Sequence, residues 1–144
     1  MEQRISMVTL GVTDLARART FYERLGWKGQ EAEETVFFQA GGLAVVLWGR
    51  DKLAADVGID DRGTDGFSGL TLAQNVRSRS QVDAILSRAD EAGATITQPA
   101  RETFYGGYAG YFTDPDGNAW EIAYNPGIAL EADGSITLPD LGTS

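Results

Sequence analysis

The first half of the chain changes from strand-like alternation to helical spacing and back. Within residues 4–12, Val8, Leu10 and Val12 share one face of an alternating pattern, which predicts a strand with one face packed on a helix. In residues 15–25 the apolar side chains recur three and four positions apart, as on one face of a helix, and Gly26 follows as a stop signal. Residues 34–40 and 43–48 predict two strands joined by a glycine pair, which is a hairpin signal.

The second half of the chain repeats this order. Residues 69–74 predict a strand and residues 80–92 a helix, after which residues 94–98 begin another strand. Residues 108–113 and 119–124 predict a hairpin whose turn is Asp-Pro-Asp-Gly. The first half thus shows a strand, a helix and two strands, and the second half a strand, a helix and three strands. We interpret both as one order, strand-helix-strand-strand-strand, that occurs twice, and this internal duplication determines the predicted fold.

The duplication predicts a single domain over all 144 residues, built from two modules. We expect module 1 at about residues 4–49, a linker rich in Asp and Gly at 50–66, module 2 at about 67–125 and a tail at 126–144. The tail has few periodic signals, so we expect it to lie over the surface or against a partner subunit.

Histidine and cysteine are both absent from the sequence. Without cysteine there are no disulfides, no thiolate catalysis and no zinc site built on sulfur. Without histidine the chain lacks the commonest metal ligand and the usual general base near neutral pH. Ser-His-Asp and Cys-His chemistries are therefore excluded.

The charge and hydropathy of the chain argue against nucleic acid and membranes as binding partners. A net charge of −9 argues against nucleic acid, because phosphate binding depends on Lys and Arg. The acidity either attracts cationic ligands over long range or only confers solubility. No apolar run approaches the ~20 residues needed to span a bilayer, and the N-terminus lacks the regions of a signal peptide. We therefore expect a cytoplasmic protein with no membrane partner.

Three segments of the chain form a recognisable pattern. They are VTLGVTDL at residues 8–15 with FY at 21–22 and LGW at 25–27, VDA at 82–84 with AG at 92–93, and YFTDPDGNAWEI at 111–122. In these segments the chain resembles the vicinal oxygen chelate superfamily, which includes glyoxalase I, bleomycin resistance proteins, extradiol dioxygenases and fosfomycin resistance enzymes. The resemblance implies an α+β fold in which two βαβββ modules pair around a cavity lined by curved sheets, in a homodimer.

The resemblance also implies four metal-ligand positions, one on the first and one on the last strand of each module. These positions fall on Met7, on Val46, on Ser68 or Gly69, and on Glu121. A catalytic divalent ion at such sites needs three or more protein ligands, and only the glutamate is a conventional one. The thioether of Met7 is a soft ligand unsuited to Mg, Mn or Ni. We therefore expect no metal and no cofactor.

Glu121 is the candidate catalytic or ligand-binding carboxylate. It lies on the opposite strand face from Trp120 and Ile122, so alternation directs it away from the helix and into the implied cavity. There it would act as a general base or pair with a cationic ligand. The alternative is a remnant carboxylate that hydrogen-bonds to a neighbour.

Aromatic side chains supply candidate stacking surfaces for a planar ligand. Trp48 shares the strand face of Val46, and Phe38, Tyr105 and Tyr108 add further rings, although each aromatic could equally be a core residue. Three glycines among the aromatics of residues 104–111 suggest a mobile flap or a place where a ligand approaches the backbone. The predicted ligand-binding set is Met7, Phe38, Val46, Trp48, Tyr105, Tyr108 and Glu121.

Three functions compete on these observations. The first is metal-independent binding of a small organic molecule, such as sequestration of a planar, cationic antibiotic by a dimer of the bleomycin-resistance type. The second is a cofactor-free enzyme, a cyclase, lyase or isomerase, that uses Glu121 as acid and base. A metal-dependent glyoxalase or dioxygenase activity is the weakest of the three, because its ligands are missing.

Overall fold

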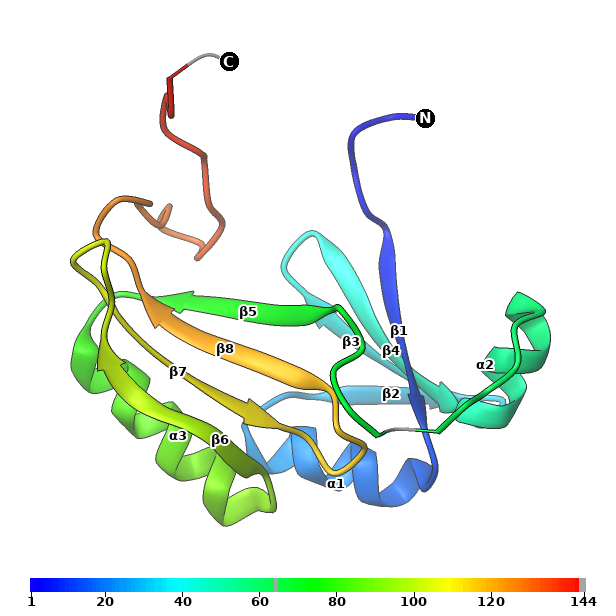
Figure 1. Cartoon of the computed structure of the whole chain (residues 1–144). Coiled ribbons are helices and arrows are strands. Elements are labelled where there is room, and N and C mark those ends of the chain that lie inside the picture. The colour runs from blue at the N-terminus through cyan, green and yellow to red at the C-terminus, as the bar shows by residue number, and fades with distance from the viewer. Residues whose placement is uncertain (64, 143–144) are drawn as a thin grey trace. The chain divides into compact units, whose positions relative to one another are not determined.

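The computed structural model describes residues 1–63 and 65–142 and divides the chain into two compact units. The first unit contains residues 1–69 together with the turn at 114–118, and the second contains residues 70–113 and 119–144. Each unit has one four-stranded mixed sheet with a helix against one face (Figure 1). The α+β class and the duplicated order of elements predicted from the sequence are confirmed.

The first unit forms a sheet of order β1-β4-β3-β2, in which β1 and β4 are parallel and the other pairs are antiparallel. Its elements are β1 (Met7–Val12), α1 (Leu15–Arg24), β2 (Gly29–Ala32), β3 (Thr35–Ala40), β4 (Leu43–Gly49) and α2 (Arg50–Val57).

Helix α1 begins at a capped end and buries one face. The side chain of Asp14 accepts a hydrogen bond from the Arg17 backbone N–H at 3.0 Å, which satisfies one of the free donors of the first turn. Phe21 and Tyr22 face the sheet and are buried, and the Tyr22 ring lies 5.7 Å from the ring of Phe38 on β3. The core of this unit therefore lies between α1 and the sheet.

The second unit repeats the arrangement with the sheet order β5-β8-β7-β6, again with one parallel pair, β5 and β8. Its elements are β5 (Thr71–Val76), α3 (Arg79–Ala92), β6 (Thr95–Glu102), β7 (Tyr108–Thr113) and β8 (Ala119–Tyr124).

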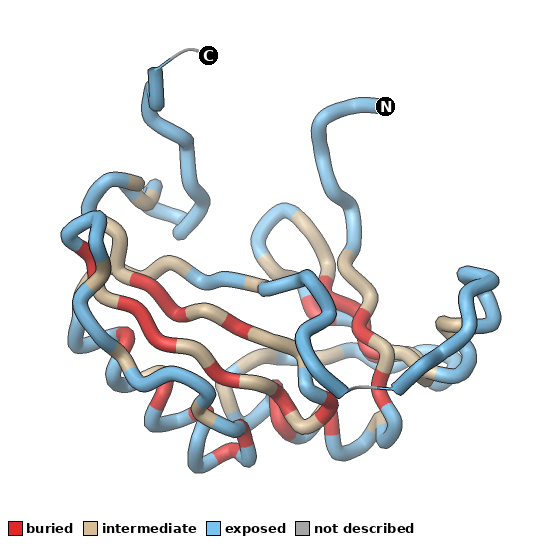
Figure 2. Tube along the Cα trace, in the orientation of Figure 1, coloured by how far each residue is buried: buried red, intermediate tan, exposed pale blue. Residues whose placement is uncertain are grey.

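Helix α3 covers one face of this second sheet, and the buried strand positions of the sheet lie on β7 and β8 (Figure 2). Val82 and Leu86 are buried on α3, and the rings of Phe112 and Trp120 stack on neighbouring strands with centroids 6.3 Å apart. Gly110 lies directly under the helix, since a Cβ built there would stand 2.4 Å from the Leu86 Cδ1 atom. The even-numbered residues of β7 and β8 thus face α3.

Three segments differ from the sequence prediction, the first being strand β2, which was not predicted. Residues 50–57 of the expected linker form helix α2, which buries none of its residues and therefore leaves no apolar periodicity in the sequence. Strand β5 begins at Thr71, two residues later than expected, after Gly69 adopts a positive φ of 89°. Among the described residues, no helix is both long and apolar enough to cross a membrane.

The tail after residue 126 is held in part by a side chain of the second module. Leu130 and Ile136 form an isolated antiparallel bridge. The guanidinium of Arg77 donates to the Glu131 carbonyl at 2.7 Å. This start of the tail is therefore anchored within its own unit, whereas Leu138 and Leu141 are exposed.

Candidate functional site

The open face of the second sheet, opposite α3, carries the candidate carboxylate. Glu121 on β8 is paired with Tyr111 on β7 and with Ala73 on β5. Because Phe112 and Trp120 face the helix, the odd-numbered neighbours Tyr111 and Glu121 project from the opposite face. Two polar side chains are thus placed directly across from each other.

The hydroxyl of Tyr111 donates a hydrogen bond to the Glu121 Oε2 atom. This hydrogen bond, together with burial and the carboxylate charge, raises the pKa of Tyr111 to about 12. The phenol is therefore protonated at neutral pH and acts as the donor. Both side chains are half-buried, and no second hydrogen bond to the Glu121 carboxylate occurs within the described ranges.

Tyr105 and Arg101 lie close enough to Tyr111 to influence it electrostatically. The negative charge of an ionised Tyr105 would raise the Tyr111 pKa, and the positive charge of Arg101 lowers it. Tyr105 belongs to the turn between β6 and β7, where its ring packs against the backbone of Gly107. A Cβ built on that glycine would stand 2.6 Å from the Tyr105 ring and 2.3 Å from the Tyr124 carbonyl oxygen. The glycine at 107 is therefore needed for close packing of the turn.

Tyr108 lies on the other side of the same sheet. Its hydroxyl donates to the Asp83 Oδ1 atom of α3 at 2.8 Å, and this hydrogen bond, with burial and nearby carboxylates, raises the pKa of Tyr108. The structure therefore brings Tyr105 near the Tyr111–Glu121 pair but places Tyr108 on the helix side. Tyr111 was not among the residues expected from the sequence, although the strand parity that directs Phe112 toward α3 would have identified it.

The open face of the first sheet carries a second group of expected residues. Val46 and Trp48 on β4 share this face with Met7 on β1, because the residues paired with Val46 and Trp48, Thr9 and Gly11, have the parity of Met7. Met7 is 59% exposed and Trp48 is half-buried, whereas Val46 is buried. Met7, Val46 and Trp48 make this part of the face apolar and offer the flat ring of an indole.

Phe38 does not lie on that open face. It is 1% exposed, is paired with Val45, and packs between α1 and the sheet against Tyr22 and Trp27. The expectation that Phe38 lines a ligand site is therefore corrected: its ring is part of the core. Its neighbour Phe37, which is 37% exposed and paired with Val46, is the phenylalanine on the open face.

The side chains at the four implied metal positions do not fit a divalent ion. Met7 and Val46 offer a thioether and an alkyl group, and residues 68–69 precede β5 and offer at most a hydroxyl. Glu121 is the one conventional donor. Within residues 1–63 and 65–142, no three His, Cys, Asp or Glu side chains are grouped so that they could hold a metal.

Asp114, in the turn between β7 and β8, has a structural role in the first unit. Its carboxylate accepts four hydrogen bonds, from the Tyr22 hydroxyl at 2.6 Å, the Asp116 backbone at 2.9 Å, and the backbone and side-chain amides of Asn118, each at 2.9 Å. Tyr22 and Asp114 are 1% and 4% exposed. The carboxylate therefore shapes the turn and fixes it to α1.

Comparison with known proteins agrees with this architecture. Residues 4–122 match the family described as the Glyoxalase/Bleomycin resistance protein/Dioxygenase superfamily. None of the curated proteins matches the chain.

Solved structures with the same fold carry several functional descriptions. A glyoxalase-related enzyme from Fulvimarina pelagi is 37% identical, with a TM-score of 0.87 over 95% of this chain and 99% of that one. A lactoylglutathione lyase from Agrobacterium tumefaciens is 20% identical, with a TM-score of 0.62 over 85% of this chain and 94% of that one. The fosfomycin resistance protein FosX from Mesorhizobium loti is 21% identical, with a TM-score of 0.66 over 87% of this chain and 94% of that one. The last two show the fold alone.

Proposed function

This chain belongs to the Glyoxalase/Bleomycin resistance protein/Dioxygenase superfamily, and from that premise we propose that it binds a small organic molecule without a metal ion. The observation that supports this most is the hydrogen bond between Tyr111 and Glu121. Glu121 is the one implied metal-ligand position with a carboxylate, and that carboxylate accepts a hydrogen bond from the Tyr111 phenol. The side chains at the other implied positions are not conventional donors to a divalent ion.

The chemistry of the open faces favours a planar ligand with a positive charge. Glu121 has a second oxygen that can accept a hydrogen bond from a cationic group, and Tyr105 and Tyr111 provide aromatic surface beside it. The net charge of −9 would attract such a ligand over long range. We infer that the ligand is a cationic antibiotic or metabolite, which the protein sequesters.

We propose that the apolar open face of the first unit, taken by itself, also binds apolar parts of a ligand. Trp48 offers a stacking ring, and Met7 offers a flexible thioether that adapts to irregular ligands. Trp48→Ala would then weaken ligand binding at this face. Removal of an aromatic ring on the sheet face that packs against α1 would instead lower the free energy of unfolding.

An acid–base enzyme is the second candidate, and the Tyr111–Glu121 pair is also the observation that favours it. In such an enzyme Glu121 would accept a proton from the substrate and Tyr111 would return one. General acid catalysis works best when the pKa of the acid lies near the working pH. The hydrogen bond raises the pKa of Tyr111 to about 12, which makes it a poor acid, so we favour binding.

The assembly and location are proposed with the function. We expect a homodimer in the cytoplasm, as implied by the resemblance to bleomycin resistance proteins. Light scattering coupled to size-exclusion chromatography tests the dimer directly. A monomer at micromolar concentration would contradict it.

The binding assignment is tested by titrating bleomycin, a cationic and partly planar probe, into metal-free protein by calorimetry. Glu121→Gln should weaken binding roughly tenfold or more, because a hydrogen bond to a charged group is lost. Glu102→Gln is the matched control, since that carboxylate lies on β6 of the same sheet, is exposed and pairs with Arg79. Equal affinity in the two variants would refute the role of Glu121.

Catalysis is separated from sequestration by the same Glu121→Gln variant. If the protein is an acid–base enzyme, a bound compound incubated with the wild type is converted, and chromatography of the reaction mixture shows the product. The same incubation with Glu121→Gln shows no product. Turnover that survives in Glu121→Gln would remove the acid–base assignment.

A further inference from the structure

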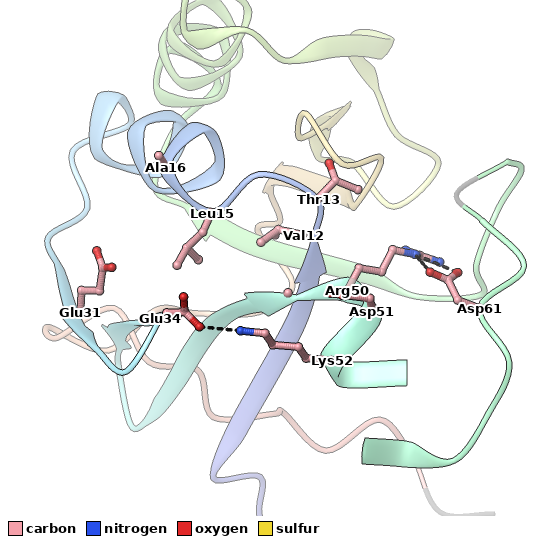
Figure 3. Close-up of a pocket in the computed structure, with 11 residues that line it drawn as sticks. Val12, Thr13, Leu15, Ala16, Glu31, Glu34, Arg50, Asp51, Lys52 and Asp61 are labelled. Atoms are coloured by element: carbon pink, nitrogen blue, oxygen red, sulfur yellow. Dashed lines mark hydrogen bonds and ion pairs between the residues drawn. The ribbon is translucent and has the colours of Figure 1, made fainter. Parts of the chain in front are cut away.

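The first unit contains a pocket that lies away from its open face. It has a volume of about 610 Å³ and opens beyond the carboxyl ends of β1 and β4, at the starts of α1 and α2 (Figure 3). Pockets of this size hold small molecules, and the carboxyl ends of parallel strands are a common position for them. Val12, which lines it, belongs to the helix side of β1, whereas Met7 lies on the open face.

The lining combines an apolar floor with charged walls. Val12, Leu15 and Ala16 provide the apolar part. Figure 3 shows two ion pairs at different sides of the pocket, Lys52 with Glu34 at 2.6 Å and Arg50 with Asp61 at 2.8 Å. Both cations that line the pocket are therefore already neutralised by carboxylates.

The lining carboxylates outnumber the lining cations by two, and one of them is left without an ion pair. Glu31 is paired with Arg19 at 2.9 Å. Asp51 forms no ion pair with any residue that the structure describes. A positively charged ligand would find an available carboxylate here, whereas an anion would have to displace Glu34 or Asp61.

A buried carboxylate, Asp116, lies behind the pocket wall, and its Oδ1 atom is ion-paired with Arg17 at 3.4 Å. Asp116 accepts hydrogen bonds from the backbone N–H and the hydroxyl of Thr13, a lining residue, at 2.9 and 3.1 Å. Its side chain is 2% exposed, and its Oδ2 atom has no hydrogen-bond partner within the described residues. Its charge also favours the protonated form of Arg50 and so raises the pKa of that guanidinium, after the larger effects of Asp61.

We propose that this pocket is a second small-molecule site, separate from the Tyr111–Glu121 face, that binds an organic cation with a compact apolar part. The ammonium or guanidinium group of the ligand pairs with Asp51. The apolar part covers Val12, Leu15 and Ala16. The ion pairs Lys52–Glu34 and Arg50–Asp61 hold the two sides of the pocket in place.

The test uses 2-phenylethylamine as the probe and follows backbone amide shifts of the full chain by NMR during titration. Saturable shifts are expected at residues 13–16 and 49–52. Asp51→Asn should weaken binding about fivefold or more, because the charge-assisted contact is lost. Asp56→Asn is the matched control, as it removes the same charge from α2 at an exposed residue that does not line the pocket.

Two further measurements make the test decisive. Ala16→Trp, at an exposed helical position, should block the pocket without disturbing the core and abolish the shifts. The anionic analogue 3-phenylpropionate should not bind. Absence of saturation, equal binding of the anion, or shifts confined to β7 and β8 would each overturn the proposal. The last result would assign the probe to the face of the proposed function instead.

Discussion

The hydrogen bond from Tyr22 to Asp114 fixes the turn between β7 and β8 to helix α1, and removing it should measurably destabilise the fold. Tyr22→Phe deletes one hydroxyl and leaves the ring in place. The two atoms are 2.6 Å apart, and both side chains are buried. Asp114 then keeps three of its four hydrogen bonds but loses the one from α1. A hydrogen bond to a charged group contributes roughly 1.5–3 kcal/mol, so we expect a loss of about 2 kcal/mol in the free energy of unfolding.

Urea unfolding followed by tryptophan fluorescence measures this loss. With a slope of roughly 2 kcal/mol per molar urea for a chain of this size, the midpoint should fall by about 1 M. Tyr124→Phe is the control, because no hydrogen bond from the Tyr124 hydroxyl is formed within the described ranges, and its midpoint should change little. A Tyr22→Phe change below about 0.5 kcal/mol would show that the carboxylate is satisfied without α1.

Three further outcomes are expected from single sites. Phe38→Ala should cost about 3–5 kcal/mol of unfolding free energy because the ring is 1% exposed. Phe37→Ala, at a 37% exposed position, should cost far less. Equal losses in urea unfolding would contradict the register of β3. Gly110→Ala should cost roughly 1–3 kcal/mol, since the added Cβ would stand 2.4 Å from a methyl group of α3, and an unchanged melting temperature would be evidence against that packing. The Tyr111 pKa is raised from 10.0 to about 12, so the folded state holds this proton more tightly. The contribution of this proton to the free energy of unfolding is complete below pH 10 and is lost as the pH rises through 12. A tyrosinate absorbance titration that finds Tyr111 ionising near pH 10 would be inconsistent with its hydrogen bond to Glu121.

Much of the fold could be predicted because the apolar periodicity is strong where helices pack on sheets. Strands β7 and β8 have the predicted bounds, and helices α1 and α3 begin within one residue of their predicted starts. Helix α2 was not predicted, since it buries no residue and its sequence carries no amphipathic pattern. The short strand β2 is mostly exposed and likewise left no signal that marked its ends.

The candidate site was harder to predict because it depends on which strand face each side chain takes. Glu121 could be placed from alternation within a single strand. Phe38 was predicted as a ligand residue because its aromatic ring could stack on a planar ligand, although its pairing with Val45 directs it into the core. Strand parity would have placed Tyr111 on the same sheet face as Glu121, but its position directly opposite Glu121 depends on cross-strand register, which is not evident in a single sequence. The pocket at the start of α2 was missed together with that helix.

The central claim is that this member of the superfamily binds its ligand without a metal, and one measurement tests it most directly. Metal content is determined on the purified protein, and thermal unfolding is then followed in EDTA with increasing bleomycin. At 100 times the dissociation constant a true ligand stabilises the folded state by about 2.7 kcal/mol, which corresponds to a rise of roughly 5–10 °C. The account predicts that rise in EDTA, with no stoichiometric metal and with a smaller rise in Glu121→Gln. A stoichiometric divalent ion whose removal abolishes the stabilisation would contradict it.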